Sequence, residues 1–139
     1  MQRLECRIWE FCSAPKGHHS TKTHVNDARP DLSSTTNVLI RSGEVQKVPI
    51  GLQMAIPVGY YGSIAGRSGL ALKCVSVLGG IIDSEYRGEV AVILHNAGQN
   101  GILVHVGQAI AQLNVLPNAA VRAVSVEALS HTERDENGS

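Results

Sequence analysis

The most informative segment of the chain reads Gly79-Gly80-Ile81-Ile82-Asp83-Ser84-Glu85-Tyr86-Arg87-Gly88-Glu89. A β-branched apolar pair leads directly into Asp83, and Tyr86 follows three residues later, with glycines on both sides. This pattern predicts a tight hairpin, because glycine accepts the backbone conformations of tight turns and lets other groups approach closely. Asp83 stands where a carboxylate could hold a water molecule, and Tyr86 offers a ring that could lie against a sugar.

Short apolar runs that alternate with turn residues continue on both sides of this segment. The spacing, about 8 to 12 residues from turn to turn, is typical of an all-β sandwich or barrel. In 89–96, the residues Val90, Val92 and Leu94 share one face of the predicted strand. The predicted strands cover 38–40, 45–48, 52–56, 75–77, 89–96, 102–106 and 109–116, and 119–129 is a further candidate.

The two ends of the chain differ from this central region. Residues 1–13 contain one alternating run and predict a strand, whereas residues 14–37 are polar and read mostly as loop. We therefore divide the chain into an N-terminal strand and polar loop (1–25), a β domain (26–129) and a mobile polar tail (130–139).

Composition excludes several classes of protein. A chain of 139 residues with 43% hydrophobic and 17% charged residues can bury a core as one domain. Its net charge of zero gives no basic surface for nucleic acid or membrane, and no apolar run is long enough to span a bilayer. Three cysteines without zinc-like spacing favour free thiols in a reducing, intracellular compartment, the cytoplasm or nucleus.

A second block, Gly66-Arg67-Ser68-Gly69, combines a guanidinium, a hydroxyl and backbone amides between glycines. These are the groups that cradle phosphate oxygens, although most such turns only reverse the chain. Two other polar residues are open to two interpretations. Gln112 shares parity with Ile110 and Asn114 in its predicted strand and could simply face solvent or an interface, and Asp31, after a proline, could be a turn or cap residue.

Together these segments resemble the motifs of the trimeric dUTP diphosphatase (dUTPase) family over about residues 26–117. Residues 79–89 resemble the third motif, 57–71 the second, and 107–113 the fourth, although Gln108-Ala109 replaces the usual Asp-Arg. In the first motif Ala28, Asp31 and Leu32 match, whereas Arg29-Pro30 replaces a glycine and an aromatic residue. The fifth motif is incomplete, because Asp135 follows Arg134 in place of glycine and no phenylalanine comes after it.

The resemblance implies a jelly-roll-like β-clip subunit, a homotrimer with active sites at subunit boundaries, and hydrolysis of dUTP to dUMP and pyrophosphate with Mg²⁺. Asp83 would orient the attacking water, and Asp31 would hold the hydration shell of the metal. The phosphates would be bound by Arg67, Ser68, Gly69, Gln112 and Arg134. Backbone groups near Gly80 and Ile82 would pair with uracil, and Tyr86 would pack on the deoxyribose and exclude a 2′-hydroxyl, unless it is only a core residue.

The departures leave other functions open. The altered first and fifth motifs favour a slower enzyme, or a dUTPase-like binding or signalling module with little or no turnover. A related dCTP deaminase shares the fold but uses a catalytic glutamate, and the Tyr86-Arg87-Gly88 hairpin resembles dUTPase instead.

Overall fold

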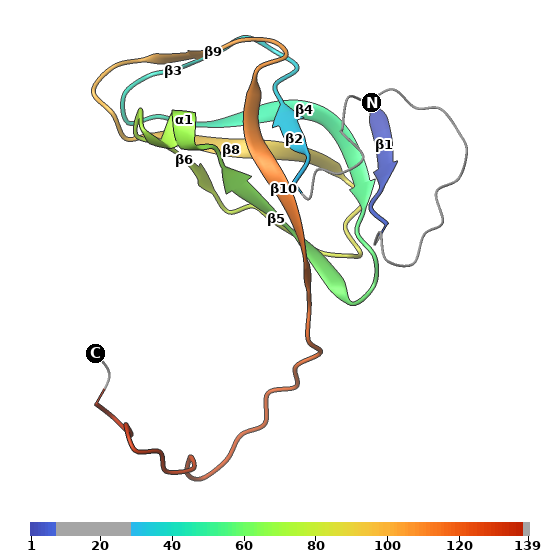
Figure 1. Cartoon of the computed structure of the whole chain (residues 1–139), viewed down its shortest axis with the longest axis vertical. Helices are drawn as coiled ribbons and strands as arrows, with labels where there is room; N and C mark the ends of the chain where they lie inside the picture. The colour runs from blue at the N-terminus through green and yellow to red at the C-terminus, as the bar shows by residue number, and fades with distance from the viewer. Residues whose placement is uncertain (8–28, 138–139) are drawn as a thin grey trace.

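The computed structural model describes residues 1–7 and 29–137, and this part of the chain is almost entirely β (Figure 1). The elements are β1 (Gln2–Glu5), β2 (Asp31–Ser33), β3 (Val38–Ile40), β4 (Val45–Ala55), β5 (Tyr60–Gly66), α1 (Ser68–Ala71), β6 (Val75–Leu78), β7 (Ile81–Ile82), β8 (Glu89–Asn96), β9 (Ile102–Val104) and β10 (Ala109–Pro117). The all-β prediction is confirmed.

The strands form two four-stranded sheets and one small sheet. Their orders are β1-β4-β8-β6, β2-β10-β5-β7 and β3-β9. One hydrophobic core receives side chains from all three sheets, and its most deeply buried members include Ile40, Val48, Val92, Leu94, Val104 and Ile110. The predicted inner face of β8 is confirmed, because Val90, Val92 and Leu94 are all buried.

The runs predicted at 45–48 and 52–56 belong to one long strand, β4, that contains an irregularity. Its pairing with β8 shifts between Pro49 and Leu52, and Gly51 takes a φ of 67° there. A side chain at Gly51 would also lie 3.0 Å from the Thr35 methyl group. Two extra residues preserve the alternation, so Val48, Ile50 and Met54 all face the core.

In β10 the predicted alternation of buried and exposed faces is wrong at one residue. Ile110 was expected on the same face as Gln112, but Ile110 and Ala111 are both fully buried. The reason is a register shift between Ala109 and Ala111 in the pairing with β2, since a bulge turns consecutive side chains toward the same side. Beyond the bulge Gln112 is partly exposed and Leu113 is buried, as predicted.

Local details differ from the prediction at several places. The described part of 14–37, residues 29–37, is mostly loop as predicted but also contains the short strand β2, and the turn after Arg67 is the one-turn helix α1. Residues 118–137 contain no strand and are exposed throughout. The Asn118 amide still donates a hydrogen bond of 2.8 Å to the Gly59 carbonyl, but beyond it this part of the described chain pairs with no strand. Figure 1 shows this C-terminal arm leaving the body of the molecule.

The N-terminal strand is confirmed over Gln2–Glu5, where it pairs in parallel with β4. The rest of the strand predicted over 1–13, from residue 8 onward, lies outside the described residues. Cys6 and Cys74 are free thiols, as expected, and burial raises the pKa of the Cys6 thiol. None of the helices in the described part is long and apolar enough to cross a bilayer.

Candidate active site

The strand order of the second sheet brings three of the predicted site residues together. Gln112 of β10 is paired with Asp31 of β2 on one side and with Ala65 of β5 on the other. Arg67 follows Ala65 by two residues and therefore projects from the same face, beside Gln112. Pro30 fixes the start of β2, because its carbonyl oxygen accepts a hydrogen bond of 3.0 Å from the Leu113 amide.

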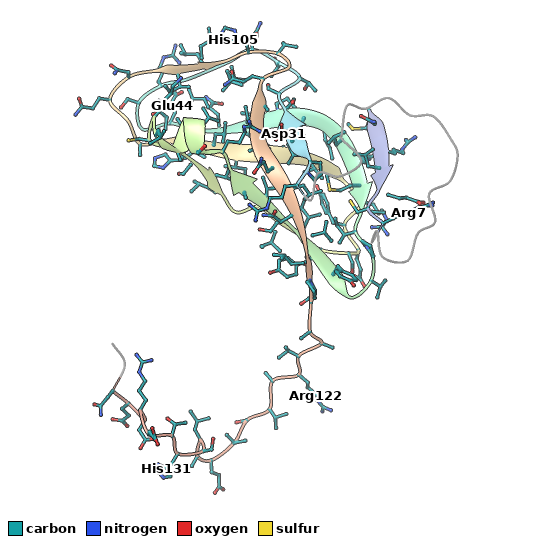
Figure 2. All side chains as sticks on the ribbon, viewed as in Figure 1. Arg7, Asp31, Glu44, His105, Arg122 and His131 are labelled. Atoms are coloured by element: carbon teal, nitrogen blue, oxygen red, sulfur yellow. The ribbon has the colours of Figure 1, made fainter. Side chains whose placement is uncertain are left out.

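Asp31 is the centre of a small polar network beside β10 (Figure 2). One of its carboxylate oxygens, Oδ1, forms an ion pair with Arg67 Nη1 and accepts a longer contact of 3.4 Å from Gln112 Nε2. The side chains of Arg67 and Asp31 are 35% and 50% exposed. Asp31 therefore orients the two groups that the sequence assigned to phosphate binding, in an environment that solvent can still reach.

An open cleft of about 510 Å³ lies next to this network. Its walls include four of the predicted phosphate-binding residues and four residues that were not among the predicted site residues. At Gly69 an added Cβ would meet no atom within 4 Å, so the backbone there is open to a ligand. The lining residues are Arg67, Ser68, Gly69, Leu70, Lys73, Gln108, Ala109 and Gln112.

Charge decides what this cleft can hold. Its lining contains two cationic side chains, Arg67 and Lys73, and no carboxylate. Hydroxyl, amide and guanidinium donors that converge on an open space suit the oxygens of an anion such as a phosphate chain. The lining of this cleft therefore suits an anion and contains no general base, and we call it the anion cleft.

The tight hairpin predicted at 79–89 is wrong as a strand pairing, because β7 pairs with β5, whereas β8 pairs with β4 and β6 in the other sheet. The segment is a tight connection between the two sheets, and the word hairpin below refers to this connection. It is built around two close backbone contacts. Gly80 has a φ of 98°, and an added Cβ would lie 3.1 Å from the Ile64 carbonyl oxygen. The Gly80 carbonyl accepts a hydrogen bond of 2.8 Å from the Ile64 amide. Ile82 is buried beside Gly62, its partner in β5, so only its backbone can face a ligand.

Beyond β7, the chain turns and presents Asp83 and Tyr86 to solvent. The Asp83 carbonyl accepts a hydrogen bond of 3.1 Å from the Tyr86 amide, and the Tyr86 hydroxyl donates one of 2.8 Å to the Glu89 carbonyl. Tyr86 is 46% exposed, which contradicts the alternative that it is an ordinary core residue. Within residues 1–7 and 29–137, the Asp83 carboxylate is exposed and has no hydrogen-bond or ion-pair partner.

The structure does not bring Asp83 and the anion cleft together within one chain. Ile82 is paired with Gly62, and Gly66 lies four residues further along β5. Asp83 and Arg67 extend beyond these two positions in opposite directions, so their Cα atoms are roughly 20 Å apart at about 3.3 Å per residue. That separation is too large for Arg67 to bind a phosphate at which Asp83 directs a water molecule.

Arg134 also lies away from the cleft, on the C-terminal arm. Its Nε donates a hydrogen bond of 3.1 Å to the Asn137 carbonyl. The next residue, Asp135, replaces the expected glycine and takes a positive φ of 39°. Its side chain stabilises the turn, since Oδ1 accepts from the Thr132 amide at 2.8 Å and the Thr132 hydroxyl accepts from the Asp135 amide at 3.0 Å.

The class of protein is thus an almost all-β subunit with a cationic cleft beside the end of β5 and a glycine-rich connection that carries Asp83 toward the other end of that strand. The dUTPase family model matches residues 16–139. The chain is 43% identical to the deoxyuridine 5′-triphosphate nucleotidohydrolase of Crocosphaera subtropica, over 99% of this chain and 96% of that protein. The Candida albicans protein of the same name is 37% identical, over 92% and 82% of the two chains.

A solved structure gives the same result for the fold. The dUTPase of Staphylococcus bacteriophage 80alpha, determined with dUPNHPP, superposes with a TM-score of 0.73 at 25% identity, covering 84% of this chain and 86% of that one. The chain belongs to the dUTPase family and has its jelly-roll-like β-clip fold.

Proposed function

We propose that this protein hydrolyses dUTP to dUMP and pyrophosphate. The observation that carries the proposal is that two separate parts of the subunit carry the predicted site residues. An anion cleft surrounds Arg67, and a separate hairpin exposes Asp83 and Tyr86. Family membership supports the choice of substrate, as do relatives named for this activity and the nucleotide in the phage structure.

The cleft binds the phosphate chain. Arg67 supplies a guanidinium whose donors match phosphate oxygens, and Ser68 and the Gly69 amide add neutral donors. Gln112 contributes its amide from β10. Asp31 keeps Arg67 and Gln112 in place before the nucleotide arrives, so these residues bind with little rearrangement.

The hairpin binds the nucleoside and directs the attack. Backbone groups at Gly80 and Ile82 pair with the uracil edge, and the Tyr86 ring packs on the deoxyribose where a 2′-hydroxyl would clash. Asp83 orients a water molecule and accepts its proton as the water oxygen bonds to the α-phosphorus. The bond from that phosphorus to the bridging oxygen breaks, and pyrophosphate leaves.

The separation of Asp83 from Arg67 supports a site that a second copy of the chain completes. We therefore propose the homotrimer of the family, in which the hairpin of one subunit faces the cleft of the next. Such a contact uses two different surfaces, and a ring of three copies closes it with three equivalent sites. Residues 26–129 would form the β domain, and Arg134 would reach a site from the arm after residue 129.

The residues present also fit Mg²⁺, although no group of three or more metal-ligating side chains occurs in the described chain. Asp31 Oδ1 is occupied by Arg67 and Gln112, whereas its other carboxylate oxygen has no partner among the described residues. One carboxylate together with substrate phosphates and water is the usual environment of Mg²⁺. Asp31 would hold the hydrated ion, which would neutralise phosphate charge.

Pyrophosphate release by the purified full chain tests the proposal. We expect Mg²⁺-dependent release from dUTP and little from UTP. Asp83→Asn should lower the rate by about 100- to 10,000-fold, the usual contribution of a general base, and leave binding of a non-hydrolysable dUTP analogue nearly unchanged. If release from dUTP does not exceed that of the Asp83→Asn variant, the protein is a binding module and not an enzyme.

A further inference from the structure

The cleft contains a cation that no motif predicted. Lys73 lines the same space as Arg67, Ser68 and Gln112, although it comes after the end of α1 and lies six residues from Arg67. Within the described chain the Lys73 side chain has no ion pair. Its charge is therefore not offset locally, whereas the charge of Arg67 is already paired with Asp31.

The backbone around Lys73 is held from both sides, which fixes where the side chain starts. The Lys73 amide donates a hydrogen bond of 3.0 Å to the Leu70 carbonyl, and the Cys74 amide donates one of 3.0 Å to the Ala71 carbonyl. Cys74 then takes a φ of 63°, uncommon for a residue other than glycine, and turns the chain into β6.

The turn at Cys74 is also tied to the end of β8. The Ala97 amide donates a hydrogen bond of 2.9 Å to the Cys74 carbonyl, and an added Cβ at Gly98 would lie 3.1 Å from the Lys73 carbonyl oxygen. The base of Lys73 is thus a rigid point on the cleft wall. Its four-carbon stem remains flexible and can carry the ammonium group to phosphate oxygens across the opening.

From this placement we infer that Lys73 is a second phosphate-contacting cation, which binds the pyrophosphate portion of the nucleotide. The rest of the lining supports this role, because Gln108 and Ala109 are uncharged and Lys73 is the second positive charge of the lining beside Arg67. The inference rests on the proposed function for the identity of the nucleotide, but its physical content is recognition of a polyphosphate chain.

The test compares three variants of the full chain by calorimetry, with inorganic tripolyphosphate, an imido analogue of dUTP and dUMP as probes. Lys73→Met should weaken binding of tripolyphosphate and of the analogue by about tenfold or more, as expected for the loss of one charge-assisted contact. Binding of dUMP should change less than about twofold. Lys73→Arg should retain most of the affinity, and Lys47→Met, which removes an exposed lysine of β4, should have no effect.

Two further measurements distinguish a failure of this inference from a failure of the proposed function. Increasing salt should reduce the affinity of Lys73→Met for tripolyphosphate less steeply than that of the unmodified chain, because one fewer charge takes part. If the unmodified chain binds tripolyphosphate without hydrolysing dUTP, the proposed function fails while the comparison of variants still decides the role of Lys73. The inference is overturned if Lys73→Met binds like Lys47→Met, if it loses dUMP equally, or if the unmodified chain binds no tripolyphosphate.

Discussion

At the scale of single residues, the structure shows that the hydroxyl and the ring of Tyr86 have different surroundings, which the sequence alone could not show. Its hydroxyl is used internally, as a donor to the Glu89 carbonyl, and its ring lies so close to Gly88 that an added Cβ would be 2.5 Å from the phenolic oxygen. The ring is nevertheless 46% exposed. The hydroxyl therefore fixes the ring, and the ring is the part available to a sugar.

This division predicts different results for two substitutions. Tyr86→Ala removes the ring and should lower the preference for dUTP over UTP, measured as the ratio of kcat/KM values, by about tenfold or more. Tyr86→Phe keeps the ring and should change that ratio by less than about threefold, while the lost hydrogen bond reduces stability by about 1 kcal/mol. A Tyr86→Ala variant that still discriminates as well as the unmodified chain would show that sugar selection lies elsewhere.

At the scale of elements, the sequence predicted what depends on local pattern and missed what depends on distant neighbours. The buried face of β8 and the cleft residues Arg67, Ser68, Gly69 and Gln112 follow from alternation and motif. Strand β2 was missed because it is only three residues long and is paired with β10, far away in sequence. The pairing of Asp31 with Arg67 was missed for the same reason, since it depends on the strand order β2-β10-β5.

The role of Lys73 could not be predicted from the sequence either. Its position depends on a one-turn helix and on the positive φ of Cys74, and the sequence indicates neither of them. The prediction for Ile110 was wrong because a bulge changes the face of the strand on which a residue lies without changing the hydrophobic pattern of the sequence. The spacing of the motifs gave no indication that the two halves of the site are far apart, because that spacing is the same whether one chain or two complete the site.

Glycines in the two halves of the site should respond differently to substitution. Gly80→Ala forces a side chain into a backbone with φ of 98° and into contact with the Ile64 carbonyl at 3.1 Å. We expect it to destabilise the fold by about 2–4 kcal/mol. Gly69→Ala meets open space and lies in α1, so the free energy of unfolding should change by less than about 1 kcal/mol.

Chemical denaturation of both variants measures these effects. Gly69→Ala should still weaken phosphate binding, because its methyl group enters the cleft from the wall that carries Ser68. Equal stability losses in the two variants would mean that the approach of Gly80 to Ile64 is not a tight contact in solution.

At the scale of the whole molecule, the geometry of one sheet is the reason for proposing a site shared between subunits. Asp83 and the cleft lie toward opposite ends of β5, and this strand is held by seven consecutive pairings with β10. This strand cannot shorten or fold to bring Asp83 to Arg67 without losing those pairings. Under the proposed function, a complete site would combine the hairpin of one copy with the cleft of another.

Mixing two inactive variants tests this requirement directly. In Asp83→Asn the cleft is intact, and in Arg67→Ala the hairpin is intact, so each homotrimer alone should be nearly inactive. After joint refolding in equal amounts, about a quarter of the sites should combine an intact hairpin with an intact cleft from a neighbouring subunit. Pyrophosphate release should recover to about a quarter of the unmodified rate. A chain that carries both substitutions, refolded in equal amounts with the unmodified protein, provides the control. About a quarter of its sites should be intact if two subunits share each site, and about half if one subunit supplies both parts. If the mixture of single variants stays inactive while mixed trimers are present, both halves of the site come from the same subunit, and the arrangement proposed here is wrong.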